Sequence, residues 1–548
     1  MKLQTIVWPS MRLESHFGDR VVRCFAERPR SLYALLDTAA RHHAEREAIV
    51  CGSERLCWRE LALLVSKLAA GLAQRGVQAG DRVALLVGNR IEFVATLFAV
   101  ARLGAVSVPI SIREQTPGLA YMINDCGACL IVHDADLVER LPAATAIASV
   151  RRRVSVGRCE GSEEFAALLG SASAGAPAAV QEEDVAVIMY TSGTTGNPKG
   201  AALTHLGIAH SVMHYQVGMG LTEQDASIAA VPLSHVTGLV ALVATMAHCA
   251  GKLVIMPAFK AADFLRLATQ ERMSHTLMVP AMYNLCLLQS DFDQHNLSSW
   301  RVGAYGGAPM PVATIERLAK QVPSLVLMNC YGATETTSPA TLMPPGETAN
   351  HNDTVGRNLP CAEIIVVDDH GREVPFGQLG EIWIKGPMVV KDYWGNPGAT
   401  QANLTGGFWH SGDIGSVDVD GYVKVVDRKK DMINRGGYKI YTIEVENALH
   451  AHPGVLECAV VAKPCPVLGE RVHAFVAVRE PSVTGEALAE HCKARLSDYK
   501  VPESFTLSET PLPRNANGKL VKRALRDPAA AMVDARVEAM VKAMVRAR

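Results

Sequence analysis

The chain has 548 residues, of which 49% are apolar and 20% charged, and this length exceeds what one hydrophobic core normally serves, so we expect about two to four domains. Its 54 basic and 55 acidic residues nearly cancel, which argues against a general nucleic-acid binder. The 13 cysteines and the absence of an apolar signal core after Met1 predict free thiols and a cytoplasmic location.

Two apolar stretches, 93–110 and 236–247, are the candidates for membrane spans. The first contains Arg102, and the second, bounded by His235 and His248, is too short to cross a bilayer. Both predict buried helices or strands, so no integral membrane span is expected.

The first 150 residues alternate between two apolar patterns. Apolar residues recur at helical spacing over 59–75 and 92–103, and short strand-like runs lie at 83–87, 105–110 and 130–133. Strands that alternate with helices predict parallel sheets covered by helices.

A strand-like run, 185–190, leads into ten residues rich in glycine and hydroxyl side chains. Glycines let backbone N–H groups approach phosphate oxygens, hydroxyls donate hydrogen bonds, and Lys199 supplies a cation. The segment is not a P-loop, because Asn197 and Pro198 separate Gly196 from Lys199 and no Ser or Thr follows. It predicts a polyanion-binding loop made of Thr191, Ser192, Gly193, Thr194, Thr195, Gly196, Asn197, Pro198, Lys199 and Gly200.

Beyond this loop the pattern continues and then changes. We expect a helix at 205–217, a strand at 227–231 and a buried helix at 239–248. From about residue 360, short strands separated by Asp, Gly and Pro predict a β-rich subdomain. The charged run 428–431 is expected to be a linker or hinge before a C-terminal unit, whose last residues, 533–544, are amphipathic.

Three polar clusters could carry chemistry. In Asn329–Glu335, Tyr331 could stack on a base and Glu335 could hold a divalent cation. Asp413 follows a glycine turn and suits the hydroxyls of a ribose, and Lys519 is presented by a turn near the end. Each cluster alone is also compatible with an ordinary loop.

Together and in this order, the motifs resemble the acyl-adenylate-forming superfamily of acyl-CoA synthetases, adenylation domains and beetle luciferases. The resemblance covers about residues 30–525. It implies an α/β fold: a large N-terminal domain of parallel α/β sheets, a β-rich subdomain and a small, mobile α+β C-terminal domain. The implied boundaries are 1–426 for the adenylation domain (β-rich at about 360–426), 427–431 for the hinge and 432–548 for the C-terminal domain.

The resemblance implies an AMP-forming carboxylate–CoA ligase. A carboxylic acid and ATP would give acyl-AMP and pyrophosphate, and coenzyme A would then form the thioester and release AMP. The expected cofactors are ATP and Mg²⁺, with coenzyme A as co-substrate. No nucleic-acid partner is expected, and a homodimer is compatible with the sequence.

The implied nucleotide site is broad. In the resemblance, the loop 191–200 grips the β- and γ-phosphates, Asp413 holds the ribose beside Arg428, and Glu335 ligates Mg²⁺. The implied ATP-binding residues are Thr191, Ser192, Gly193, Thr194, Thr195, Gly196, Lys199, Gly307, Ala308, Asn329, Tyr331, Gly332, Thr334, Asp413, Arg428 and Lys519.

The same resemblance assigns the catalytic and transfer roles. Thr191, Lys199, Glu335 and Lys519 are the implied catalytic residues, with Lys519 acting during adenylation. Lys430 is the implied hinge about which the C-terminal domain swings for thioester formation. The strand at Gly436, Gly437 and Lys439 would then receive coenzyme A.

The acid is expected to be apolar, either fatty, alicyclic or aromatic. His235 matches the gate of the family's acyl pocket, and an apolar segment follows it. The implied substrate-binding residues are His235, Gly238, Leu239, Gly306 and Gly332. Small residues such as Gly238 indicate room for a medium chain. Two alternatives stay open: an acyl-AMP ligase that loads a carrier protein, and a non-catalytic nucleotide- or acyl-binding relative.

Overall fold

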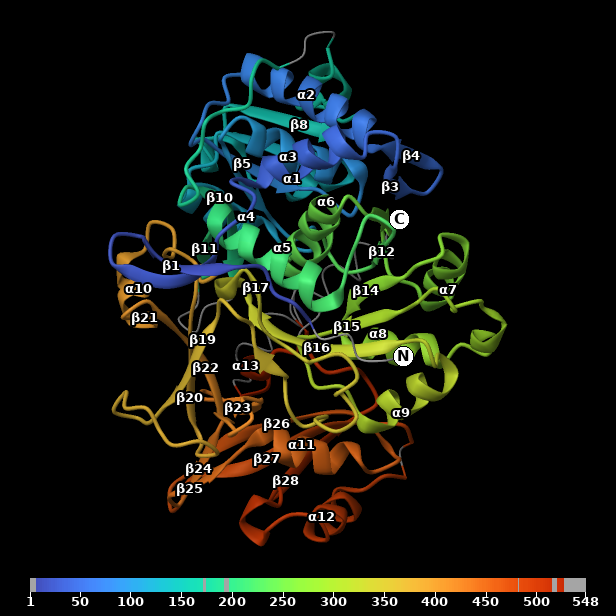
Figure 1. Ribbon diagram of the computed structural model, residues 1–548. Helices are drawn as coiled ribbons and strands as arrows, with labels where there is room; N and C mark the ends of the chain where they lie inside the picture. The colour runs from blue at the N-terminus through green and yellow to red at the C-terminus, as the bar shows by residue number, and fades with distance from the viewer. Residues whose placement is uncertain (1–5, 171–173, 192–196, 481, 515–519, 527–548) are drawn as a thin grey trace. The chain divides into compact units, whose positions relative to one another are not determined.

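The computed structural model describes residues 6–170, 174–191, 197–480, 482–514 and 520–526. The chain divides into two compact units (Figure 1). The first unit comprises Met1–Ile365, Trp383–Ser411 and Val417–Lys424, and the second comprises Val366–Ile382, Gly412–Ser416 and Val425–Arg548.

The first unit is built on two mainly parallel sheets. In the nine-stranded sheet, the central strands from β16 to β3 run parallel, and antiparallel strands close both edges. The strands in spatial order are β18 (Arg357–Asn358), β17 (Ser338–Leu342), β16 (Val326–Ala333), β15 (Val302–Tyr305), β14 (His275–Met278), β12 (Ala226–Ala229), β13 (Lys252–Ile255), β3 (Glu47–Cys51) and β4 (Glu54–Cys57).

The seven-stranded sheet is parallel except at one edge, where β10 and β11 form an antiparallel pair. Its order is β11 (Lys199–Thr204), β10 (Val185–Thr191), β6 (Val106–Pro109), β5 (Arg82–Leu86), β7 (Leu130–Asp134), β8 (Arg152–Val156) and β9 (Glu163–Glu164). The alternation of helices and strands read from the sequence is therefore confirmed.

Apolar helices fill the space between the two sheets. Helix α5 (His205–Met219) contacts β11 of one sheet and β17 of the other, and it packs on α1 (Leu32–His42) and α6 (Thr245–Cys249). The layer is completed by α2 (Trp58–Gln74) and α3 (Ile91–Arg102), which pack on α1 (Figure 1). Burial on all sides explains the apolar character of 93–110 and 236–247, and no helix in the described ranges is both long and apolar enough to cross a membrane.

The outer face of the nine-stranded sheet carries a second core. Trp300 is fully buried there, stacks on Tyr283 at 5.8 Å and donates its indole N–H to the carbonyl of Val302. The helices on this side are α7 (Ala261–Gln270), α8 (Pro280–Leu287) and α9 (Val312–Gln321). Elsewhere, α4 (Thr116–Cys126) packs on the seven-stranded sheet through Leu119 and Ile123.

The β-rich region expected from about residue 360 is present. It forms a five-stranded sheet with the order β19 (Glu363–Val367), β20 (Gly380–Lys385), β22 (Phe408–Val417) and β21 (Leu404–Thr405), and β23 (Val423–Arg428) also pairs with β22. Helix α10 (Pro397–Asn403) precedes β21. The N-terminal hairpin consists of β1 (Met11–His16) and β2 (Arg20–Phe25), and its Arg20 donates to the carbonyl oxygens of Val390 and Lys391, which lie between β20 and α10.

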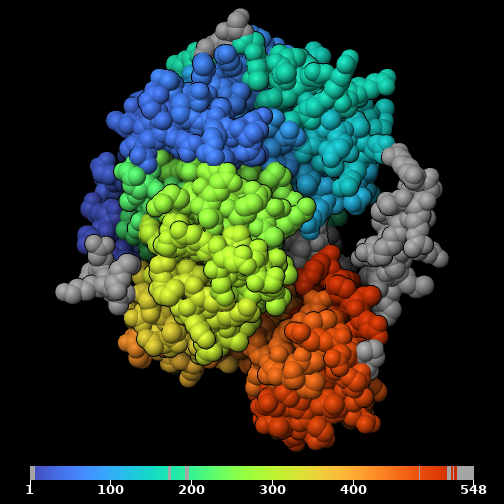
Figure 2. Space-filling model, turned by 90° about the vertical axis from the view of Figure 1, so that its right-hand side faces the viewer, coloured from blue at the N-terminus to red at the C-terminus, as the bar shows by residue number. Residues whose placement is uncertain are grey.

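The second unit has an α+β core of its own. Its sheet runs β25 (Tyr438–Ile440), β24 (Ile433–Arg435), β27 (Gly469–Val478) and β26 (Val455–Cys465), with β28 (Ser504–Ser508) parallel to β27. The helices are α11 (Thr442–His450), α12 (Gly485–Lys493) and the short α13 (Lys522–Arg526). The described residues between 432 and 526 appear in orange to red in Figure 2. The expected α/β fold class is thus confirmed, whereas the amphipathic segment 533–544 lies outside the described residues.

Two buried histidines of α5 hold neighbouring elements in place. The Nδ1 atom of His205 accepts a hydrogen bond from the backbone N–H of Leu32, and the Nε2 atom of His210 accepts one from Phe25, each at 3.1 Å. An accepting nitrogen has no proton, so both imidazoles are neutral in the fold. Burial lowers the pKa of His205 and of His210 to about 4.

We expect these histidines to make the first unit sensitive to acid. Because their pKa values are lowered by folding, the unfolded chain binds more protons below about pH 6.5, so the free energy of unfolding falls as the pH drops toward 4. Each group contributes a slope of up to about 1.4 kcal/mol per pH unit. Urea denaturation between pH 5 and 7.5 measures how the free energy of unfolding changes with pH. His205→Gln should flatten the slope and the exposed His42→Gln should not; equal slopes in all three proteins would contradict this origin.

Candidate functional site

The carboxylate of Glu335 lies where several distant segments of the first unit meet. It follows β16 in a short 3₁₀ turn, Thr334–Thr336, and is 8% exposed. Its Oε1 atom accepts hydrogen bonds from the hydroxyl of Thr191 and from the hydroxyl of Tyr393, each at 3.1 Å. Within the described chain, nothing donates to Oε2. The described residues therefore leave the lone pairs of Oε2 unengaged, and the cation role that the sequence predicts for Glu335 stays a prediction.

Tyr393 is the second centre of this arrangement. Its phenol is 4% exposed, accepts the indole N–H of Trp409 at 3.3 Å and donates to Glu335. The ammonium of Lys199 lies 5.3 Å from the centre of its ring, within the range of a cation–π interaction. Burial, and secondarily the charge of Glu335, raises the pKa of Tyr393 well above its usual value. The sequence reading missed Tyr393, because Tyr-Trp-Gly-Asn is typical of an ordinary turn.

The predicted polyanion loop spans the turn between β10 and β11. Thr191, the last residue of β10, pairs with Lys199, the first residue of β11. The hairpin thus brings a hydroxyl and an ammonium from the two ends of the loop to Glu335 and Tyr393 respectively. Ser192, Gly193, Thr194, Thr195 and Gly196 lie outside the described residues.

The remaining nucleotide candidates of the first unit gather at the carboxyl ends of parallel strands. Tyr305 on β15 is in register with Asn329 on β16, so Gly306 leaves β15 directly beside Cys330. Gly307 and Ala308 follow as exposed residues, while Asn329 is buried and donates to the carbonyl of Thr354 at 3.4 Å. In open α/β sheets this edge is the usual place for ligands.

Backbone crowding explains two of the glycines. A Cβ atom at Gly306 would stand 2.5 Å from the carbonyl oxygen of Cys330, and one at Gly332 would stand 1.6 Å from that of Ser338. Gly332 follows Tyr331 at a β-bulge between β16 and β17, and Thr334 is buried just after it. Both glycines let backbone segments approach closely, so their positions are fixed by packing whatever they bind.

The acyl-pocket candidates lie in and after a loop that is held by side-chain hydrogen bonds. Asn89 donates to the carbonyls of Val231 and Met256 and accepts from Leu233, and this network fixes the loop that carries His235. The Nδ1 atom of His235 accepts from the backbone N–H of Thr237 at 3.3 Å and lies 3.1 Å from its hydroxyl. His235 is half-buried.

The helix that follows is a π-helix, Thr237–Ala244, whose residues from Gly238 onward are buried. Such segments are rare and frequent at functional sites. A Cβ atom at Gly238 would stand 2.2 Å from the carbonyl oxygen of Pro232, so loop packing alone already requires glycine here. The medium-chain space inferred from the sequence stays a prediction. Leu239 is fully buried beside it.

Two predicted residues form an ion pair in the second unit. Asp413 is 4% exposed, and its Oδ1 atom lies 2.8 Å from Nε of Arg428. The backbone N–H of Lys429 also donates to the carbonyl of Gly412. The sequence prediction that Arg428 stands beside Asp413 therefore agrees with the geometry.

The remaining candidates of the second unit lie on a hairpin and its approach. Gly436 and Gly437 join β24 to β25 with φ angles of +58° and +92°, a left-handed region in which glycine is favoured. Lys439 on β25 lies 3.4 Å from Asp369, and both side chains are largely exposed. Lys430 is exposed and its carbonyl accepts from Arg526. Lys519 lies outside the described residues.

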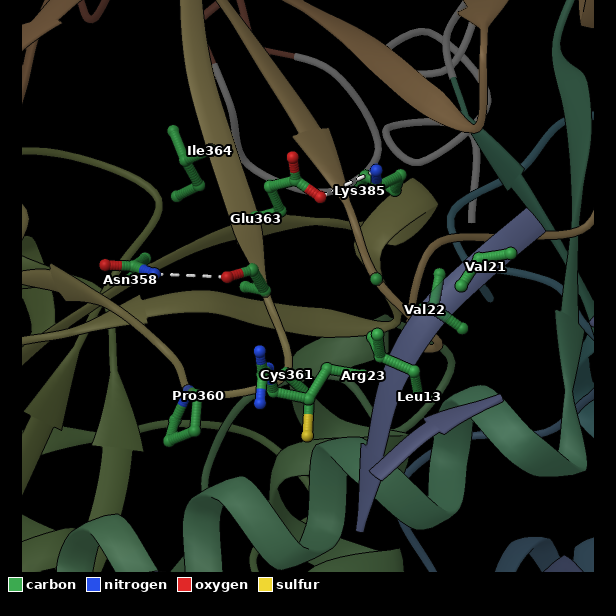
Figure 3. Close-up of a pocket in the computed structure, with 12 residues that line it drawn as sticks. Leu13, Val21, Val22, Arg23, Asn358, Pro360, Cys361, Glu363, Ile364 and Lys385 are labelled. Carbon is green, nitrogen blue, oxygen red and sulfur yellow. Dashed lines mark hydrogen bonds and ion pairs between the residues drawn. The ribbon is translucent and has the colours of Figure 1, made fainter. Parts of the chain in front are cut away.

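A cavity and a cluster of possible metal ligands also occur in the first unit, away from the predicted site residues. A cavity of about 350 Å³ lies between the β1–β2 hairpin and residues 358–364, and it includes none of the predicted site residues (Figure 3). Glu14, His16 and Cys24 bring ligand atoms within 4.8 Å of one another. However, both oxygens of Glu14 already accept from the buried guanidinium of Arg28, whose positive charge would repel a metal ion.

Comparison with known proteins adds independent information. The family model of AMP-binding enzymes matches residues 36–394, and the model of the AMP-binding enzyme C-terminal domain matches residues 444–519. The chain is 35% identical over 488 residues to a feruloyl-CoA synthase of Amycolatopsis sp., covering 89% of this chain and 96% of that protein.

A second relative and a solved structure point the same way. A long-chain-fatty-acid–CoA ligase of Mycobacterium tuberculosis, FadD13, is 32% identical over 484 residues, which cover 87% of this chain and 94% of the relative. The o-succinylbenzoate coenzyme A synthetase of Bacillus subtilis, solved with ATP and a magnesium ion, superposes with a TM-score of 0.81 at 28% identity, covering 91% of this chain and all of that one.

The crowding at Gly332 gives a prediction about stability. In Gly332→Ala, the methyl group would force β16 and β17 apart, and we expect the free energy of unfolding to fall by at least about 1–3 kcal/mol. Chemical denaturation measures the change. The control is Gly170→Ala, where nothing lies within 4 Å of the added Cβ atom. A Gly332→Ala protein as stable as the control would show that the bulge relaxes without cost.

Proposed function

Because this chain belongs to the family of AMP-binding enzymes, we infer that it is an AMP-forming acid–CoA ligase, an acyl-CoA synthetase. It activates a carboxylic acid with ATP to acyl-AMP and pyrophosphate, and it transfers the acyl group to the thiol of coenzyme A with release of AMP. The observation that carries this proposal is the buried Glu335 carboxylate, held by Thr191 at one end of the polyanion loop and by Tyr393, whose ring contacts Lys199 at the other end.

The residues around Glu335 fit a magnesium ion. Mg²⁺ prefers oxygen ligands and is usually held by one or two carboxylates together with substrate phosphates. Glu335 offers such a carboxylate, with Oε2 not engaged by the described chain, and the solved synthetase named above binds ATP together with magnesium. When bound, the ion would neutralise negative charge on the triphosphate.

We propose the nucleotide contacts from the same arrangement. The loop 191–200 and Lys199 hold the β- and γ-phosphates, and Thr334 holds the α-phosphate. Asn329 binds the adenine edge and Tyr331 its face, with Gly306, Gly307, Ala308 and Gly332 as backbone neighbours. Asp413, with Arg428 as its ion-pair partner, holds the ribose hydroxyls. A carboxylate placed against two hydroxyls suits that role, because each hydroxyl can donate to one of its oxygens.

Charge and positioning account for the adenylation step. The substrate carboxylate must attack the α-phosphorus of a polyanion, and like charges resist this approach. Lys199, and Lys519 from the C-terminal segment, supply positive charge where negative charge develops on the phosphoryl oxygens. The rest of the barrier falls because the reactants are held in line.

The hairpin of β24 and β25 suits the transfer step. Gly436 and Gly437 carry no side chain, and nothing described lies within 4 Å of a Cβ atom placed at Gly437. A pantetheine arm can therefore pass close to this backbone, bringing the thiol to the acyl-AMP carbonyl. Lys439 would be available to a phosphate of coenzyme A, because its ion pair with the exposed Asp369 is weak and screened by solvent.

The acid is apolar in this proposal. His235, Gly238 and Leu239 begin a pocket wall that continues as the buried, wholly apolar segment 239–244. The relatives are named for a feruloyl group and for long-chain fatty acids, so aromatic and fatty acids are the classes to test. A cytoplasmic location, proposed from the sequence, agrees with the free state of the 13 cysteines.

We expect Lys519→Ala to separate the two half-reactions. Removing one transition-state donor typically costs about 10²–10³ in rate, so pyrophosphate exchange should fall by that factor while thioester formation from preformed acyl-AMP persists. Pyrophosphate exchange measures the first half-reaction, and AMP release from preformed acyl-AMP and coenzyme A measures the second. The acid is first chosen with the unmodified protein, by coenzyme A-dependent AMP release with acids from acetate to palmitate, benzoates and cyclohexanecarboxylate. Loss of both half-reactions would contradict the role of Lys519, and exchange without thioester formation would indicate a carrier-protein acceptor.

We also propose that residues 427–431 are a hinge between an adenylation domain, 1–426, and a mobile domain, 432–548, with Lys430 as the pivot. Proline at residue 430 would fix the φ angle there and would disfavour the α region for the preceding residue, Lys429. Lys430→Pro should therefore slow thioester formation by about 10-fold or more while pyrophosphate exchange changes little. Lys430→Ala is the control for loss of the side chain, and unchanged thioester formation in Lys430→Pro would exclude the pivot.

A further inference from the structure

The segment that carries Tyr393 is hydrogen-bonded through its backbone to β11 of the β10–β11 hairpin. The N–H of Ala202 donates to the carbonyl of Asp392 at 3.1 Å, and the N–H of Trp394 donates to the carbonyl of Gly200 at 2.7 Å. Ala201 and Tyr393 form a β-bridge between these bonds. Tyr393 is therefore held beside Ala201 of β11, two residues after Lys199.

The hydrogen bonds of the Tyr393 hydroxyl have a defined direction. An indole N–H can only donate, so the oxygen of Tyr393 accepts from Trp409. A phenol has a single proton, and an ionised carboxylate can only accept, so that proton points at Oε1 of Glu335. The Tyr393 hydroxyl and the Thr191 hydroxyl thus occupy one oxygen of the carboxylate and leave the other available.

The ring of Tyr393 acts on a second group. Lys199 lies 5.3 Å from its centre, and both the ring and Trp409 are nearly excluded from solvent, at 4% and 5% exposure. Desolvation strengthens the attraction between an ammonium and an aromatic face. One buried side chain therefore contacts both the acidic group and the basic group of the proposed MgATP site.

We propose that Tyr393 is a positioning residue that couples the Glu335 carboxylate to the Lys199 ammonium and so fixes the spacing between the magnesium ligand and the phosphate-binding cation. The inference rests on the proposed function of Glu335 and Lys199. Groups that orient a ligand through hydrogen bonds typically change metal affinity by about 10- to 100-fold when removed. Tyr393 itself touches neither substrate nor metal in this role.

The test measures binding and not turnover. The dissociation constant of Mn²⁺ is determined by electron paramagnetic resonance in the presence of α,β-methylene-ATP. We expect it to rise about 10- to 100-fold in Tyr393→Phe, which removes only the hydroxyl. Tyr33→Phe, which removes a hydroxyl bonded to Arg102 from another buried tyrosine, is the matched control and should bind Mn²⁺ as the unmodified protein does.

A double-mutant cycle shows whether Tyr393 acts through Glu335. Glu335→Gln should weaken Mn²⁺ binding at least as much as Tyr393→Phe, and the double variant should be no weaker than Glu335→Gln alone. Weakened binding in Glu335→Gln with normal binding in Tyr393→Phe would overturn the role of Tyr393 only. Normal binding in Glu335→Gln would remove the metal role of Glu335, and the coupling with it.

Two further variants keep the proposal testable if Tyr393→Phe folds poorly. Trp409→Phe retains the Tyr393 hydroxyl but removes the group that orients it, so the Mn²⁺ constant should lie between those of the unmodified protein and Tyr393→Phe. Tyr393→Leu also removes the ring beside Lys199, and without metal it should bind the ATP analogue about 2- to 5-fold more weakly than Tyr393→Phe does. Unmodified behaviour in both variants would overturn the coupling.

Discussion

The burial of the Glu335 carboxylate is the constraint on which the rest of the site depends. A charged group removed from water is costly unless hydrogen bonds or opposite charge compensate it. Here Thr191 and Tyr393 supply the hydrogen bonds, and they come from the end of β10 and from the segment before α10. The backbone of Glu335 also accepts from the N–H of Val390. Satisfying one carboxylate therefore brings three parts of the first unit together.

The mixed parallel sheets explain why chemistry collects at this place. Strands β14, β15 and β16 run in the same direction. Beyond the bulge of Tyr331 and Gly332, the chain turns back at Thr334–Thr336 into β17. The second sheet contributes only its edge hairpin, whose ends carry Thr191 and Lys199. The Thr191 hydroxyl and the Lys199 ammonium are thus held at strand ends, and the Glu335 carboxylate is held in a short turn directly after a strand. Such placement suits a reaction whose barrier depends on the position of charges.

Much of the fold could be predicted from the sequence, because the period of apolar residues reports burial. The helix expected at 59–75 and the strands expected at 83–87 and 130–133 correspond to α2, β5 and β7 within about two residues at each end. The segment expected as a buried helix at 239–248 begins instead as a π-helix, because apolar residues on every side leave no period to distinguish the two. The ends of elements and the pairing of strands depend on contacts between distant residues.

The candidate site was predictable only where a motif carried its chemistry. Thr191, Lys199, Glu335 and the ion pair of Asp413 and Arg428 stand in recognisable segments. Tyr393 and Asn89 do not. Tyr393 donates to Glu335, 58 positions away, and Asn89 donates to Val231, 142 positions away, and no local pattern reports such bonds. Gly238, interpreted from the sequence as pocket space, also has a packing role that no local pattern reports, because an added Cβ atom would meet the carbonyl of Pro232.

We propose that Glu335 binds the metal of an ATP-dependent acid–CoA ligase, with its carboxylate held by the hydroxyls of Thr191 and Tyr393. A crystal structure of the full chain with ATP and Mn²⁺, measured at the manganese absorption edge, locates the ion by its anomalous scattering. We predict an anomalous peak within coordination distance of Oε2 of Glu335, the oxygen that the described chain leaves available, with phosphate oxygens completing the ligand set. A manganese ion bound to the triphosphate with no contact to Glu335 would contradict it.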